Sequence, residues 1–173
     1  MLKTAVGRVF TRFRRMALGN ERFARCSGVE IGTGCRILSN IVTTEPWLVS
    51  IGDRVTISSE VSFVTHDGSG WLYRDDRGRR FRYAPIRIGN HVFIGTRATI
   101  MPGVSVGDNV VIGAGSLVTK SVPSGTVVAG VPARKIAPWE DYMAKVADWP
   151  ASNDKKGNTY REQVDSIAGS YRP

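Results

Sequence analysis

The stretch Ile88–Pro123, IGNHVF IGTRAT IMPGVS VGDNVV IGAGSL VTKSVP, repeats with a period of six residues. Each hexad opens with an aliphatic residue: Ile88, Ile94, Ile100, Val106, Ile112 and Val118. A glycine follows in four of the six, at Gly89, Gly95, Gly107 and Gly113. A period of six fits neither a helix, at 3.6, nor an open strand, at 2. It predicts short strands and tight turns wound into a parallel β-helix, and six consecutive hexads in phase argue against an ordinary sandwich.

The same pattern occurs earlier in the chain. Its opening residues are Ile31, Ile37, Ile51, Ile57 and Phe63. Ile37 and Ile51 are out of phase by two residues, which predicts a small insertion near Glu45. The aliphatic column is expected to form the core. The glycines are expected to permit turn backbones that other residues resist.

Composition limits the classes of partner. A length of 173 residues suits one domain, and 42% hydrophobic residues allow a sizeable core. The formal net charge of +9 attracts anions such as nucleotide phosphates, an acidic glycan or an anionic membrane. The sequence carries no nucleic-acid motif, so no nucleic-acid partner is expected. Two cysteines make no disulfide framework, and we find neither a secretory signal nor an apolar run long enough to span a membrane, so we expect a cytoplasmic protein.

Segments 1–28 and 137–173 flank the repeat domain, which we place at residues 29–136. Apolar residues recur at helical spacing near the N-terminus, at Leu2, Val6, Val9, Phe13 and Met16. This amphipathic helix either caps the open end of the coil or lies on a membrane surface. After the repeat, a short helix is expected from Pro138, followed by a polar tail that is either helical near Tyr160 or loose.

Two histidines occupy the same register, three residues after a hexad opening. His91 is followed by Val92, which keeps the inward pattern, so His91 is expected at a solvated corner. His66 is followed by Asp67, where an inward apolar residue belongs. The coil therefore stops, and a loop at about 67–87 leaves it. A long insertion in a compact domain is usually functional.

Taken with the tandem hexads, VIGAGSLVTKSVPSGTVVAGVPARKI at 111–136 resembles the hexapeptide-repeat acyltransferases. The similarity is greatest to the maltose, galactoside and nodulation-type sugar O-acetyltransferases and to those of capsule and exopolysaccharide pathways. The resemblance covers about 29–136. It implies an all-β, left-handed β-helix with triangular coils, a homotrimer with active sites between subunits, and acetyl-CoA as co-substrate without a metal.

The family places its catalytic histidine just before such a loop, and His66 matches that position. A neutral imidazole can remove the proton of a sugar hydroxyl as the hydroxyl attacks a thioester. Asp67 either orients His66 or is a turn residue. Family positions near the donor match Thr96 (thioester and oxyanion), Ala114 (pantetheine) and Thr119, Lys120 and Arg134 (nucleotide phosphates).

The acceptor site is less defined. Asn40, Glu45 and Trp71 are the residues expected to bind it, and Tyr73 is a further aromatic on the loop. Alternatives to a sugar hydroxyl are the amine of an amino sugar and a xenobiotic such as an antibiotic. Two readings from other classes are a non-enzymatic adaptor and a zinc hydratase. The hydratase site needs three histidines, and the chain has two.

Overall fold

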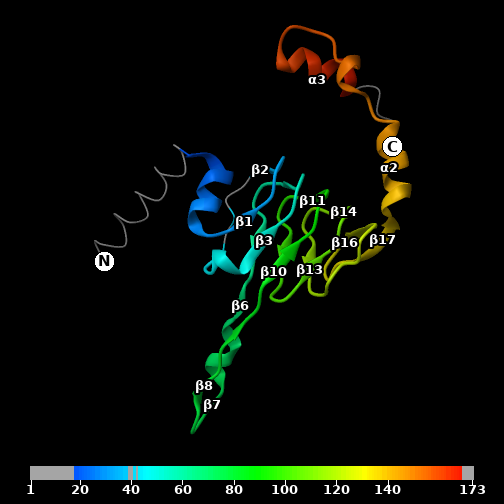
Figure 1. Ribbon diagram of the computed structural model, residues 1–173. Helices are drawn as coiled ribbons and strands as arrows, with labels where there is room; N and C mark the ends of the chain where they lie inside the picture. The colour runs from blue at the N-terminus through cyan, green and yellow to red at the C-terminus, as the bar shows by residue number, and fades with distance from the viewer. Residues whose placement is uncertain (1–17, 39–40, 42, 169–173) are drawn as a thin grey trace. The chain divides into compact units, whose positions relative to one another are not determined.

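The computed structural model describes residues 18–38, 41 and 43–168. The chain divides into two units, Met1–Trp139 and Glu140–Pro173. The first unit is a parallel β-helix, whose coils stack from the blue end to the yellow end of the ribbon in Figure 1.

The coils form three faces, each a sheet of stacked short strands. The first face contains β1 (Glu30–Ile31), β3 (Val49–Ile51), β10 (Ile86–Ile88) and β13 (Ser105–Val106). The second contains β2 (Arg36–Ile37), β4 (Thr56–Ile57), β11 (Val92–Ile94), β14 (Val110–Ile112), β16 (Thr126–Ala129) and β17 (Arg134–Pro138). The third contains β5 (Ser62–Phe63), β12 (Thr99–Ile100) and β15 (Leu117–Val118). All neighbours within these faces are parallel except β16 and β17.

The register confirms the hexad count. Ile94 pairs with Ile112, and both open a hexad, so one coil is three hexads. The pairing of Ile37 with Ile57 makes an earlier coil two residues longer, which is the insertion that the phase shift predicts. Ile57 pairs with Ile94, so the next coil carries a much longer insertion in addition to its three hexads. Stacking therefore continues through both insertions without slipping.

The aliphatic column is the core. Ile57, Phe63, Ile94 and Ile112 are at most 1% exposed. Burial of each such side chain contributes about 1.5–3 kcal/mol. Because each coil covers the apolar interior of the next, the core is continuous along the stack.

The glycine column serves a different purpose from the one expected. A Cβ on Gly95 would lie 2.5 Å from the backbone nitrogen of Ala114, in the next coil. These glycines are needed because adjacent coils approach closely, and none of the four hexad glycines has a positive φ. The left-handed turn positions are instead held by residues such as His91 (φ 54°) and Arg97 (φ 61°). The expectation that this column supplies turn backbones was wrong.

The N-terminal end of the coil is covered by residues 18–27, which are helical. The Arg25 guanidinium donates hydrogen bonds to the carbonyl oxygens of Ile31 and Gly32. Asn20 Nδ2 donates to the carbonyl oxygen of Ile37 at 3.3 Å. This helix therefore satisfies carbonyls of the first coil, which is what a cap requires. The part of the expected amphipathic helix at 1–17 lies outside the described residues.

The insertion after His66 is an ordered β-ribbon, which we call the arm (residues 66–85). It contains β6 (His66–Asp67), η2 (Gly68–Leu72), β7 (Arg74–Asp75), β8 (Gly78–Arg79) and β9 (Arg82–Tyr83). β6 pairs antiparallel with β9, and β7 with β8. Figure 1 shows the arm running out from the coil. β10 rejoins the coil at Ile86, slightly earlier than the expected return at Ile88.

The remaining elements are short. η1 (Pro46–Leu48) lies in the coil that is two residues longer, directly before β3. The chain continues into α2 (Trp139–Ala147), η3 (Ser152–Asp154) and α3 (Tyr160–Ala168). The tail around Tyr160 is thus helical. None of the helices in the described ranges is both long and apolar enough to cross a membrane.

Candidate active site

His66 lies where the chain leaves the third face and enters the arm. Its side chain is 40% exposed. Nδ1 lies 3.0 Å from Glu45 Oε2 and 3.2 Å from Thr44 Oγ1. The Thr44 hydroxyl donates to the same Glu45 oxygen at 2.7 Å. A carboxylate can only accept, so Nδ1 carries the proton and donates it to Glu45. In the neutral form of the imidazole, the lone pair is then on Nε2.

Glu45 reaches His66 from the two-residue insertion. A third donor, the Thr65 hydroxyl, also binds Oε2. Partial burial raises the pKa of Glu45, but the hydrogen bonds from Thr65, Thr44 and His66, with the charge of His66, lower that pKa below its ordinary value overall. Glu45 is therefore an ionised carboxylate held against the imidazole. The sequence predicted Glu45 at the acceptor, and this contact with His66 was missed.

A signal for this contact was present in the sequence. The two-residue phase shift lengthens this coil, and Glu45 and Thr65 are separated by one such lengthened coil, as Ile37 and Ile57 are. Stacking thus places Glu45 beside the residue before His66. The choice between His66 and Asp67 needed the structure.

Asp67 takes the turn role. Its carboxylate accepts a hydrogen bond from the backbone nitrogen of Ser69 at 2.9 Å and caps η2. The bonds from Ser69 lower the pKa of Asp67. Of the two roles that the sequence left open, orienting His66 is the one that the structure does not show.

A cavity of about 400 Å³ opens beside His66. Its lining residues come from the arm and from the corner between the third and first faces in three coils. They are Val64, His66, Asp67, Gly68, Arg82, Met101, Pro102 and Thr119. Thr119, predicted near the donor, therefore shares a cavity with the predicted base. We call this the His66 cavity.

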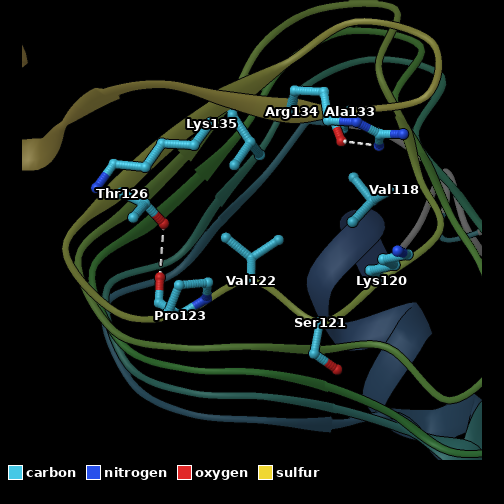
Figure 2. A pocket seen from close by; sticks show the side chains of 10 residues that line it. Val118, Lys120, Ser121, Val122, Pro123, Thr126, Ala133, Arg134 and Lys135 are labelled. Carbon is cyan, nitrogen blue, oxygen red and sulfur yellow. Dashed lines mark hydrogen bonds between the residues drawn. The ribbon is translucent and has the colours of Figure 1, made fainter.

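A second cavity, of about 260 Å³, lies at the last coil (Figure 2). Val118, Val122 and Val128 supply apolar surface. Three cations line it as well: Lys120, Arg134 and Lys135. The structure thus brings the predicted Lys120 and Arg134 together, and an apolar floor with cationic edges suits a ligand that has an apolar arm and phosphates. Lys135 was not singled out from the sequence.

Thr96 and Ala114 lie elsewhere. They occupy the corner between the second and third faces, where Gly115 N donates to the carbonyl oxygen of Thr96 at 2.7 Å. Within one chain, the third face separates this corner from His66. Both residues are exposed. A site that combines Thr96 with His66 therefore requires a second copy of the chain.

Trp71 is not among the described residues that line the His66 cavity. Trp71 lies in η2 of the arm, 72% exposed, with the Arg79 guanidinium 4.9 Å from its ring centroid. Asn40 lies outside the described residues. His91 sits at a corner, with Nε2 3.5 Å from Arg54 Nη1. No group of three or more histidine, cysteine, aspartate or glutamate side chains that could hold a metal occurs within the described ranges.

A known repeat family matches the hexads of this chain. Residues 85–120 match the repeat family described as "Hexapeptide repeat of succinyl-transferase". Protein CapG of Staphylococcus aureus is 41% identical over 160 residues, covering 91% of this chain and 92% of CapG.

Two solved structures are also similar. A maltose O-acetyltransferase from Clostridium difficile 630 matches with a TM-score of 0.52 and 30% identity, over 68% of this chain and 73% of that one. A galactoside acetyltransferase in complex with coenzyme A matches with a TM-score of 0.53 and 32% identity, over 76% of this chain and 69% of that one. These similarities imply that the coils wind left-handed. Together with the hexad register, they establish that the chain belongs to the hexapeptide-repeat acetyltransferases and is an acyltransferase.

Proposed function

We propose that this protein transfers an acetyl group from acetyl-CoA to a sugar hydroxyl, on a unit of a surface polysaccharide or its precursor. The family membership supports the reaction class, and the coenzyme A complex of a similar acetyltransferase supports the donor. The galactoside and maltose O-acetyltransferases support a sugar acceptor. The observation that carries the proposal is the His66–Glu45 pair beside an open cavity.

In the proposed mechanism, His66 is the general base. Nε2 removes the proton of the acceptor hydroxyl while the hydroxyl oxygen attacks the thioester carbonyl. The tetrahedral intermediate collapses with breakage of the carbon–sulfur bond. The thiolate of CoA takes the proton from His66 and leaves as the thiol. The reaction gives one acetyl ester and one free CoA, with no covalent enzyme intermediate.

Glu45 is the positioning residue for His66. Its carboxylate fixes the tautomer with Nε2 unprotonated, and its charge stabilises the imidazolium that forms during transfer. This role replaces acceptor binding as our proposal for Glu45. Trp71 and Asn40 stay predictions for the acceptor.

We propose that the donor, acetyl-CoA, binds to residues of the last coil and of two corners of the β-helix. Lys120 and Arg134 bind the nucleotide phosphates, and Thr119 faces the end of the pantetheine arm in the His66 cavity. Thr96, by its backbone nitrogen or hydroxyl, stabilises the oxyanion, and Ala114 lies along the pantetheine. Because Thr96 and His66 occupy different corners, this assignment requires a second copy of the chain. We propose a homotrimer, in which corners of neighbouring copies meet.

The test is release of free CoA from acetyl-CoA in the presence of a saccharide. His66→Ala should reduce turnover about 10²- to 10⁴-fold. Calorimetry should show nearly unchanged affinity for acetyl-CoA. His91→Asn is the matched control, since asparagine tolerates the left-handed backbone of that corner. Undiminished turnover in His66→Ala would remove His66 from the mechanism.

Two further readouts separate the alternatives. Alkaline hydroxylamine cleaves an acetyl ester and leaves an acetamide, so it distinguishes hydroxyl from amine transfer on a product. An adaptor without activity should bind no acetyl-CoA in calorimetry.

A further inference from the structure

The arm carries five arginines, and Arg82 differs from its neighbours. The Arg79 guanidinium lies between two aromatic rings, 4.9 Å from Trp71 and 4.7 Å from Phe81. Arg80 pairs with Asp75 at 2.5 Å and covers the Tyr73 ring at 5.3 Å. Such cation–π contacts and ion pairs hold a guanidinium in place and engage its charge within the arm.

Among the residues that the structure describes, the Arg82 guanidinium has neither an aromatic ring nor a carboxylate as a partner. Arg82 pairs with Asp67 through its backbone. It is nevertheless the only arginine of the arm among the described residues that line the His66 cavity. Its charge acts on Asp67 opposite, but the two side chains form no ion pair, and the Asp67 carboxylate already accepts from Ser69. Arg82 therefore presents free N–H donors beside the cavity.

The register places this cation close to the reacting position. In the β6–β9 pair, Tyr83 lies directly opposite His66 and Arg82 opposite Asp67. The Tyr83 ring centroid lies 5.7 Å from that of His66. Tyr83 is 55% exposed, so its ring offers an apolar surface beside the imidazole. Tyr83 does not line the His66 cavity, so the side chain of β9 that an acceptor in this cavity meets is Arg82.

We infer that Arg82 binds an anionic group on the acceptor, and that the substrate is a saccharide bearing a carboxylate or a phosphate. This inference rests on the proposed function, because it concerns the acceptor of the same site. A guanidinium binds both groups through paired N–H donors, with directional contacts that a lysine cannot reproduce. The net charge of +9 also favours the approach of anions.

The experiment compares three probes that share one ring: methyl α-D-galactoside, methyl α-D-galacturonide and α-D-galactose 1-phosphate. Turnover is followed by CoA release, and binding by saturation-transfer NMR with the full chain. A charge-assisted hydrogen bond contributes about 1.5–3 kcal/mol. We therefore expect kcat/KM at least about tenfold higher for one anionic probe than for the neutral one. The galacturonide and the phosphate report separately which oxyanion is preferred.

Arg82→Gln should remove this preference by lowering kcat/KM for the anionic probe about 10- to 100-fold, with the neutral probe unchanged. Arg82→Lys should restore part of it. Arg77→Gln is the control, because it removes the same charge from the same arm away from the cavity. Equal thermal midpoints show that the variants fold.

Other outcomes overturn the inference. One is equal use and equal binding of all three probes, or binding of none. Another is an Arg82→Gln effect that is the same on neutral and anionic probes, or that appears only in the KM for acetyl-CoA. Failure of the proposed function looks different: acetyl-CoA would then not bind, or His66→Ala would keep full turnover.

Discussion

Replacing Glu45 by glutamine tests the positioning role most directly. Glutamine keeps an oxygen that can accept from Thr44, Thr65 and His66 Nδ1, so the local fold should remain. What it removes is the negative charge beside the imidazolium. A hydrogen bond to a charged group contributes about 1.5–3 kcal/mol and a neutral one about 1 kcal/mol, so the loss is about 0.5–2 kcal/mol.

That loss converts to a fall in kcat of about 2- to 30-fold. The lower part of the range is expected, because the His66 side chain is 40% exposed and solvent screens the pair. The assay is CoA release at saturating acetyl-CoA, with KM measured for donor and acceptor separately. The control is Glu30→Gln, which replaces an exposed carboxylate on the first face by a carboxamide and should keep the wild-type kcat.

A double variant gives the refuting result. If Glu45 acts through His66, then Glu45→Gln should add little to His66→Ala, because the two residues act as one unit. An undiminished further loss in the His66→Ala background would contradict this. So would a raised acceptor KM with unchanged kcat, which is what the acceptor role predicted from the sequence requires.

Three further outcomes are expected. Gly95→Ala should lower the thermal midpoint by about 2–12 °C, because its Cβ would lie 2.5 Å from Ala114 N and overpacking costs about 1–3 kcal/mol. Gly68→Ala is the control, because a Cβ there meets open space and should change the midpoint little. Equal midpoints for the two variants would contradict the close approach of the coils at Gly95. Lys120→Ala should raise the KM for acetyl-CoA more than that for the acceptor, and equal effects would move the donor site elsewhere. Because the pKa of Glu45 is lowered on folding, the stability that Glu45 contributes is complete above its ordinary pKa of 4.5 and is lost as pH falls through the lowered value. Between neutral pH and about pH 3, the thermal midpoint of Glu45→Gln should therefore fall less than that of the wild type. Parallel curves of midpoint against pH would contradict this.

The hexad pattern predicted much of the fold. The period of six in Ile88–Pro123 indicated the coil, and the aliphatic column indicated the core. The phase shift between Ile37 and Ile51 indicated the insertion that the Ile37–Ile57 pairing confirms. The missing apolar residue at Asp67 indicated where the arm leaves. These features are local and periodic, and a buried column repeats in the sequence because the coil repeats in space.

The sequence misassigned the reason for the glycines and did not indicate the contact of Glu45 with His66. Both depend on what lies one coil away: a neighbouring backbone against Gly95, and the imidazole against the Glu45 carboxylate. A residue's position in its own hexad does not report which neighbour touches it, since that depends on the length of the coil between them.

By itself, the sequence determined the stacked coils, the inward column and the break after His66, because each follows from where apolar residues recur along one chain. Only the tertiary structure decided that Glu45 holds His66, that Arg82 lines the same cavity, and that Thr96 lies on another corner. Those relations join residues from separate turns of the stack. They are set by coil length and side-chain direction, which the period of six leaves unspecified.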